Sequence, residues 1–265
     1  MKRDSELVGI AIDETRALAF LNGTVTPWID EFRAQFPLDG QGDSFHLLNS
    51  VFMAVDAHVY YGLIRGLRPR RIIEIGAGRS TQIAAAAVKR NVADGGPKTD
   101  ITAIEPVPPP YLPRDSVELR QENVQSVPLT VFAQLEAGDV LFIDSTHVLR
   151  AGGDVHYEYA EILPRLPAGV YVHIHDVSLP RAYPQVYFDS KLYWNEQYLL
   201  QALLTFNDRF EVLWPSAYMA LNIQEMSERW CRSWRKCRAA FRPPNPQVSG
   251  CAQKQPESSR EPFDG

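Results

Sequence analysis

Cysteine is scarce in this sequence, and its placement excludes two kinds of protein. The three cysteines among 265 residues are Cys231, Cys237 and Cys251, all late in the chain and without a Cys-x-x-Cys pair. An odd, clustered set of this kind builds neither a disulfide-stapled scaffold nor a four-ligand zinc site. We therefore expect reduced cysteines that take no part in the chemistry.

Long hydrophobic runs and an excess of positive charge are also missing. No apolar stretch approaches the roughly 20 residues that cross a bilayer, and residues 1–6 are charged where a secretory signal would become apolar. The formal net charge is −5, which disfavours binding of nucleic acid by the chain as a whole. These features predict a cytoplasmic protein with neither membrane nor nucleic acid as a partner.

The apolar content that is present suffices for one large domain. Hydrophobic residues make up 45% of the chain and charged residues 22%, as in ordinary globular proteins. We predict four parts: a helical preamble at 1–46, a core domain at 47–225, a basic amphipathic helix at 226–242 and a disordered tail at 243–265. The basic helix either binds a partner or docks on the domain with its arginines in solvent.

Strand and helix patterns alternate from residue 71 onward. The predicted strands are 71–75, 101–105, 117–120, 140–144 and 170–175, and the main helices between and after them are 80–91, 154–166 and 194–206. This alternation predicts an α/β fold with a parallel sheet. Two further apolar segments, 210–214 and 218–223, are joined by only three residues, which predicts an antiparallel hairpin at the edge of the sheet.

The stretch 71–81 reads Arg-Ile-Ile-Glu-Ile-Gly-Ala-Gly-Arg-Ser-Thr and predicts a strand, a tight turn and the start of a helix. Gly76 and Gly78 let the backbone approach a ligand closely, and Ser80 or Thr81 can cap the helix, whose first amides face the same crevice. We expect a nucleotide-like ligand there. Thr81 at the third fingerprint position, with Glu74 before the turn, argues against a dinucleotide.

Polar side chains follow the other predicted strands at the points where they end. Glu105 ends the second strand, Asp144 and His147 follow the fourth, and His175 and Asp176 follow the fifth. Ligands of open α/β sheets bind beyond the carboxyl ends of the strands. We therefore expect these residues to share one site, with Glu105 placed to accept hydrogen bonds from a ribose diol.

These motifs together resemble the class I S-adenosylmethionine-dependent methyltransferases, and most closely their small-molecule O-methyltransferase group. The residues that carry the resemblance are Glu74-Ile75-Gly76-Ala77-Gly78, Glu105, Phe142-Ile143-Asp144-Ser145-Thr146-His147 and His173-Ile174-His175-Asp176. The resemblance covers about residues 47–223 and implies a Rossmann-like sheet of seven strands with helices on both faces. It implies S-adenosyl-L-methionine as cofactor, bound by Glu74, Gly76, Gly78, Ser80, Thr81, Glu105 and Asp144.

In the catechol-type branch of the same fold, carboxylates after strands four and five hold a divalent metal such as Mg²⁺. The matching residues here are Asp144 and Asp176, with His175 beside them as a third candidate ligand. This sequence has His175-Asp176 where that branch has an Asp-Asn pair, so metal use stays open. A histidine ligand would favour a transition metal over Mg²⁺.

The same branch places a basic residue three positions after the first carboxylate, where it removes the proton of the acceptor hydroxyl. That position holds His147 in place of lysine. An ordinary imidazole titrates near ~6.5, so we expect His147 to accept a proton at neutral pH. The predicted catalytic residues are thus His147, Asp144 and His175, while His173, in mid-strand, is predicted to be a core histidine.

The predicted function is methyl transfer from S-adenosylmethionine to a hydroxyl of a small-molecule acceptor, such as a sugar or a secondary metabolite. Residues 180–196 are rich in aromatics and either line the acceptor pocket or form an ordinary packed loop. Two alternatives stay open: an NAD(P)-binding oxidoreductase, and a non-catalytic protein that retains the fold. A homodimer is also compatible with the sequence.

Overall fold

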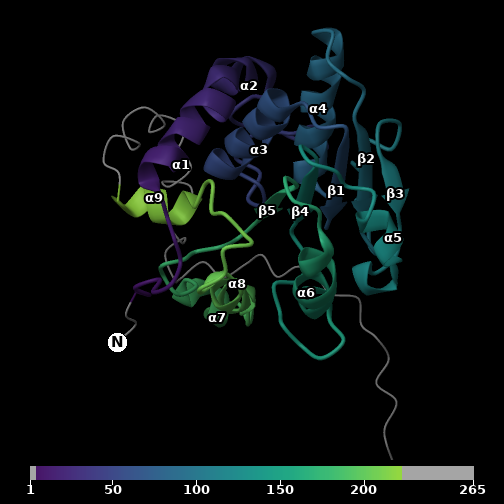
Figure 1. The fold of residues 1–265 in the computed structure, drawn as a ribbon. Coiled ribbons are helices and arrows are strands. Elements are labelled where there is room, and N and C mark those ends of the chain that lie inside the picture. The colour runs from purple at the N-terminus through teal and green to yellow at the C-terminus, as the bar shows by residue number, and fades with distance from the viewer. Residues whose placement is uncertain (1–3, 223–265) are drawn as a thin grey trace, which may run out of the picture.

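The computed structural model describes residues 4–222 of the chain. The predicted basic helix at 226–242 and the predicted tail at 243–265 lie outside these residues, which are drawn in colour in Figure 1.

A parallel sheet of five strands forms the centre of the described fold (Figure 1). The strands are β1 (Arg71–Ile75), β2 (Asp100–Ile104), β3 (Glu118–Arg120), β4 (Val140–Ile143) and β5 (Tyr171–Ile174). Their order across the sheet is β3-β2-β1-β4-β5, and every neighbouring pair is parallel. Ile75 pairs with both Ile104 and Ile143, so the carboxyl ends of the three central strands reach one edge together. The predicted α/β class with a parallel sheet is confirmed.

Helices precede, connect and follow these strands. The α-helices are α1 (Glu14–Phe20), α2 (Ile29–Gln35), α3 (Ala54–Leu67), α4 (Arg79–Ala93), α5 (Leu129–Phe132), α6 (Asp154–Tyr157), α7 (Gln185–Asp189), α8 (Glu196–Leu204) and α9 (Ser216–Asn222). Shorter π-helical turns lie at Leu21–Val25 and Glu158–Ile162, and 3₁₀ turns at Thr26–Trp28, Val124–Ser126 and Leu163–Arg165. Within residues 4–222, no helix combines the length and apolar character needed to cross a membrane.

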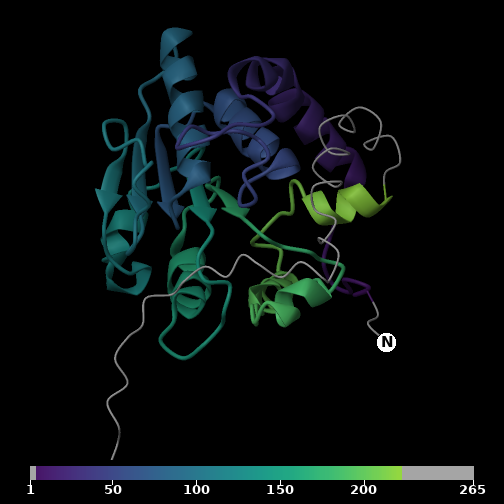
Figure 2. The same cartoon turned by 180° about the vertical axis from the view of Figure 1, so that it is seen from behind.

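The sheet buries both of its faces, as a parallel sheet requires. On one face, Ile72 and Phe142 pack with residues of α3 and α4 in a first core. On the other, Ile73 and Leu141 pack in a second core with the segment that contains α6 and with α8. Figures 1 and 2 show the two helical layers on either side of the strands. Because side chains alternate along β1 and β4, each strand contributes apolar residues to both cores.

The predicted antiparallel hairpin is wrong, and the sheet has five strands within residues 4–222 where seven were predicted. Residues 210–214 form no strand, and α9 occupies the second half of the predicted hairpin. Pro215 accepts a bond from the Met219 amide in the first helical turn, and Met219 is fully buried. Tyr218 also donates to Glu14, so α9 lies beside α1 in both views. Burial of Met219 and the bond from Tyr218 to α1 together favour the helix over a strand.

Candidate functional site

The turn after β1 brings the glycine motif against the end of β4. Gly76 has a φ of 85°, and its amide donates to the Ile104 carbonyl at 2.9 Å. A Cβ on Gly76 would overlap the backbone carbonyl oxygen of Asp144. Only glycine therefore satisfies both the positive φ and this close approach. The turn and the Asp144 segment form one continuous rim.

The start of α4 differs in detail from the predicted cap. Gly78 occupies the position before the helix, and its amide donates to the Thr81 hydroxyl at 3.0 Å. Ser80 and Thr81 lie inside the helix and are buried, so neither is the capping residue. A Cβ on Gly78 would approach only the Tyr111 hydroxyl, at 3.8 Å, which leaves open space above the first turn of a helix of 15 residues.

Two glutamates brace this turn from opposite sides. Glu105 accepts from the Ala77 amide at 3.2 Å and from the Val107 amide at 2.9 Å, which joins the turn to the loop after β2. Each carboxylate oxygen keeps a second lone pair for another donor. Glu74 is fully buried and accepts from the Tyr60 hydroxyl at 2.8 Å. Burial raises the pKa of Glu74 to about 7, against the opposing hydrogen bonds from Thr81 and Tyr60.

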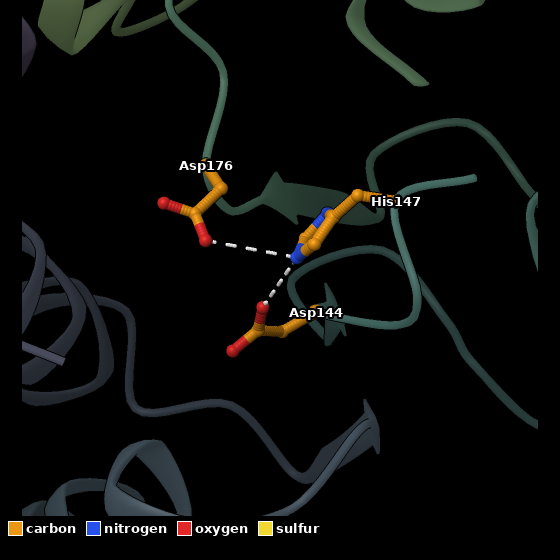
Figure 3. A group of neighbouring side chains, drawn as sticks. All are labelled: Asp144, His147 and Asp176. Carbon is orange, nitrogen blue, oxygen red and sulfur yellow. Dashed lines mark ion pairs between the residues drawn. The ribbon is translucent and has the colours of Figure 1, made fainter. Parts of the chain in front are cut away.

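Asp144, His147 and Asp176 meet beyond the ends of β4 and β5 (Figure 3). His147 Nε2 lies 3.2 Å from Asp144 Oδ1 and 3.6 Å from Asp176 Oδ2. His147 and Asp176 both have left-handed backbones, with φ of 58° and 56°. These strained turns fold the chain back at the strand ends and direct the three side chains at one another. One ligand atom from each residue falls within 4.8 Å of the others.

His175 joins the same carboxylates from the other side. Its Nδ1 lies 3.3 Å from Asp144 Oδ1 and 3.4 Å from Asp176 Oδ2. Its Nε2 lies 3.7 Å from Asp56 Oδ2, which is too long for a hydrogen bond. Despite burial, the charge of Asp144 and hydrogen bonds to the aspartates hold the pKa of His175 well above its ordinary value. All the residues predicted to be catalytic or metal-binding therefore lie in one cluster.

Glu196, the first residue of α8, is the site residue that the sequence did not reveal. Its Oε2 lies 2.7 Å from His147 Nδ1, and the Tyr159 hydroxyl donates to its Oε1 at 2.9 Å. Glu196 is 1% exposed. It stands 49 residues from His147, and no motif spacing links the two. The only signal available was a carboxylate at the start of a predicted helix.

The acidic surroundings change the proton affinities of the cluster. Burial disfavours a charged imidazole, but hydrogen bonds with Asp144 and Glu196 outweigh it and raise the pKa of His147 to about 10. The charge of His175 and the bond from His147 overcome burial and hold the pKa of Asp144 well below its usual range. The expectation of an ordinary imidazole is not met, because the carboxylates of Asp144 and Glu196 hold the pKa of His147 above its usual value.

The donor set suits a divalent cation. Neighbouring ligands around a first-row metal, each at about 2.0 to 2.2 Å from it, stand roughly 3.0 to 3.5 Å apart. The 3.2 Å separation between His147 Nε2 and Asp144 Oδ1 lies in this range, and the 3.6 Å separation from Asp176 Oδ2 lies just above it. Two carboxylates and one imidazole leave room for ligands from solvent or substrate. A metal ion held there would displace the proton on His147 Nε2, because a ligand imidazole must be neutral.

Two other predicted features are His173 and the aromatic segment 180–196. His173 packs its ring against Phe142 at 4.9 Å between centroids, and burial of the ring lowers its pKa to about 4. The residue as a whole is only half-buried and also lines a groove beside β5, so the prediction of a core histidine is met only in part. In the 180–196 segment, Tyr187 and Trp194 pack edge to face with 4.7 Å between ring centroids, and the Trp194 centroid lies 4.3 Å from that of the His147 ring. This segment therefore forms one wall beside the cluster.

A groove of about 910 Å³ runs along the open edge of β5. Asp176 and His173 line it together with apolar side chains, among them Leu7, Ile10, Leu200 and Leu203. Its volume is that of pockets that hold drug-sized molecules. The groove therefore offers space for a small molecule next to Asp176.

Comparisons with known proteins agree with this geometry. Residues 73–177 match a family described as "Methyltransferase domain". The matched range begins in β1, ends one residue after Asp176, and includes the glycine turn, Glu105 and the Asp144 segment. A relative in Archaeoglobus fulgidus, named "Uncharacterized protein", is 33% identical over 142 residues, which span 51% of this chain and 62% of the relative. No solved structure matches the chain significantly.

Proposed function

We propose, on the premise that residues 73–177 form a methyltransferase domain of the class I S-adenosylmethionine-dependent type, that this protein methylates a hydroxyl of a small molecule. The observation that carries the proposal is the Asp144, His147 and Asp176 cluster, which lies on the same rim as the glycine turn. A methyl donor bound at the turn and a hydroxyl bound at the cluster would meet across that rim.

The cofactor part of the proposal assigns S-adenosylmethionine to the crevice between the glycine turn and Glu105. The open space above Gly78 and the first amides of α4 suit the amino-acid part of the cofactor. Glu105 keeps lone pairs for the ribose hydroxyls. Glu74, Ser80 and Thr81 are buried, so they support the turn from within. Asp144 faces the reacting side.

The metal part assigns a divalent cation to Asp144, His147 and Asp176. When bound, such an ion lowers the pKa of an acceptor hydroxyl and orients its oxygen. His147 then serves as a ligand through Nε2, which replaces the expected role of a free base. His175 Nδ1 donates to Asp144 and lies 3.4 Å from Asp176 Oδ2, so His175 holds the two aspartates together. The imidazole nitrogen favours a first-row transition ion over Mg²⁺, and the two carboxylates make Mn²⁺ a suitable member of that series.

The chain's own contribution to catalysis is position. Alignment of the acceptor oxygen with the sulfonium methyl converts the transfer into an effectively unimolecular step. Asp176, whose side chain is 30% exposed, is the carboxylate that an acceptor can reach from the groove. Its second carboxylate oxygen, which is not the one 3.6 Å from His147 Nε2, would take the hydroxyl proton as the methyl group is transferred. The groove and the wall with Trp194 provide an apolar setting for a sugar derivative or secondary metabolite.

The proposal is tested first by calorimetry with S-adenosylhomocysteine, the demethylated cofactor, with and without Mn²⁺. Micromolar binding is expected. A panel of hydroxylated small molecules, offered with S-adenosylmethionine and Mn²⁺, should then reveal an acceptor by formation of S-adenosylhomocysteine. Binding of NADH in place of S-adenosylhomocysteine would instead establish the oxidoreductase alternative. Cofactor binding with no turnover on any acceptor would favour the non-catalytic one.

A further inference from the structure

The start of α8 is clamped to the turn that carries His147. The amides of Asn195 and Glu196 both donate to the His147 carbonyl, at 2.9 and 3.2 Å, and the Leu149 amide donates to the Asn195 side chain. His147 itself has a left-handed backbone. These bonds join two segments that are far apart in sequence. The first turn of α8 therefore fixes the position of the His147 backbone, from which the ring extends.

The Glu196 side chain then determines how that ring faces. A carboxylate only accepts hydrogen bonds, so the imidazole nitrogen beside it, Nδ1 at 2.7 Å, must carry a hydrogen. Tyr159 supplies the second partner of Glu196 from the π-helical turn at Glu158–Ile162. With both carboxylate oxygens engaged in a buried site, Glu196 has little freedom to turn away.

We propose that Glu196 is a positioning residue that fixes the hydrogen of His147 on Nδ1 and directs Nε2, as a metal-ligand nitrogen, at Asp144 and Asp176. Figure 3 shows Nε2 pointing at both aspartates. The Trp194 ring packs against the imidazole, with 4.3 Å between the ring centroids, and so restricts its rotation. The inference rests on the proposed function only in treating the three side chains as a metal site.

The arrangement follows the general chemistry of metal-bound histidine. A carboxylate on the far nitrogen fixes the tautomer, orients the ring and makes the ligand nitrogen more basic, and its loss typically costs about 10- to 100-fold in metal affinity. Tyr159 would act one step further out, by orienting Glu196. Its effect on affinity should therefore have the same sign as that of Glu196 and be smaller.

The test uses Zn²⁺, which gives diamagnetic complexes, as the probe ion. Calorimetry of Glu196→Gln and Glu196→Leu should show Zn²⁺ affinity reduced by about 10-fold or more, and Tyr159→Phe by less. In the Zn²⁺ form of ¹⁵N-histidine-labelled protein, one imidazole should carry its hydrogen on Nδ1 with slow exchange. That signal should be assigned by its loss in His147→Gln and should exchange quickly in Glu196→Leu.

Glu158→Gln is the matched control, because Glu158 is as deeply buried and bonds to Ser145 rather than to His147. Its Zn²⁺ affinity and imidazole signal should remain those of the wild type. If Glu196 only stabilises the fold, its variants should melt at a lower temperature while Zn²⁺ affinity and the imidazole signal stay unchanged. That result would overturn the proposal. Equal losses of affinity in Glu158→Gln and Glu196→Gln would also overturn it.

S-adenosylhomocysteine titrations of the same proteins separate this inference from the proposed function. If wild type binds S-adenosylhomocysteine but no Zn²⁺, the positioning role fails and the methyltransferase assignment stands. If wild type binds Zn²⁺ and loses it on substitution of Glu196, yet binds no S-adenosylhomocysteine, the positioning role stands and the proposed function fails. Glu196 variants with weak Zn²⁺ binding and unchanged cofactor affinity support both.

Discussion

Gly76 lies directly against Asp144: a Cβ on Gly76 would come within 1.9 Å of the Asp144 carbonyl oxygen. The contact joins the turn after β1 to the end of β4, where the Asp144 amide also donates to the Ile75 carbonyl at 2.8 Å. The glycine turn and the Asp144 segment are thus packed and hydrogen-bonded to each other. A change that separates these two backbones should disturb both.

Gly76→Ala should destabilise the protein more than its positive φ alone explains. The left-handed backbone costs an alanine about 1 to 2 kcal/mol, and overlap in a packed site adds roughly 1 to 3 kcal/mol. Gly95→Ala is the control, because Gly95 has a similar φ of 75° and open space around it. Urea unfolding should give the larger loss in free energy of unfolding for Gly76→Ala. Equal losses would refute the contact.

Glu105→Ala should weaken binding of S-adenosylhomocysteine without loss of fold. The ribose hydroxyls would lose a charged acceptor worth about 1.5 to 3 kcal/mol, a loss of roughly 10- to 100-fold in affinity. Glu118→Ala removes an exposed carboxylate at the start of β3 and should leave the affinity unchanged. Calorimetry compares the two variants. An unaltered dissociation constant in Glu105→Ala would place the ribose elsewhere.

Asp176→Asn should abolish tight Mn²⁺ binding and retain cofactor binding. The substitution removes a charged ligand atom from the cluster, while the glycine turn and Glu105 stay intact. Asp189→Asn is the control, since Asp189 is exposed at the end of α7. Electron paramagnetic resonance of bound Mn²⁺ measures the loss. If Asp176→Asn keeps the wild-type affinity, the ion is held by other groups.

Metal binding should strengthen as pH rises. The pKa of His147 is raised to about 10, so a metal ion must displace its proton at any lower pH. The apparent Mn²⁺ affinity should therefore increase by up to about tenfold per pH unit between pH 6 and 9. Calorimetry in buffers of different ionisation enthalpy should show proton release. A pH-independent affinity would mean that His147 is already neutral.

The metal-free protein should lose stability toward alkaline pH. The folded pKa of His147 lies above the unfolded value of ~6.5, so its contribution is complete below about pH 6.5 and is lost as pH rises through about 10. His147→Gln removes this dependence. The difference in free energy of unfolding between wild type and His147→Gln should shrink from pH 6.5 to 10. A difference that stays constant would contradict the raised pKa.

Local sequence determined the glycine turn, the strands that end at the site and the residues that follow them. Positive φ at Gly76 and apolar runs such as 140–143 depend on sterics and burial within a few residues. Parallel strands then bring their carboxyl ends to one edge. The sequence alone therefore predicts that four residues share one site, namely Asp144, His147, His175 and Asp176.

Tertiary structure decided what those residues touch. Residues 216–222 form α9 because Met219 is buried and Tyr218 donates to Glu14 on α1. Neither contact can be predicted from the local sequence pattern. Glu196 reached His147 because the first turn of α8 docks on the turn after β4. The proton affinity of His147 followed from that contact and from burial, and both depend on distances through space rather than along the chain.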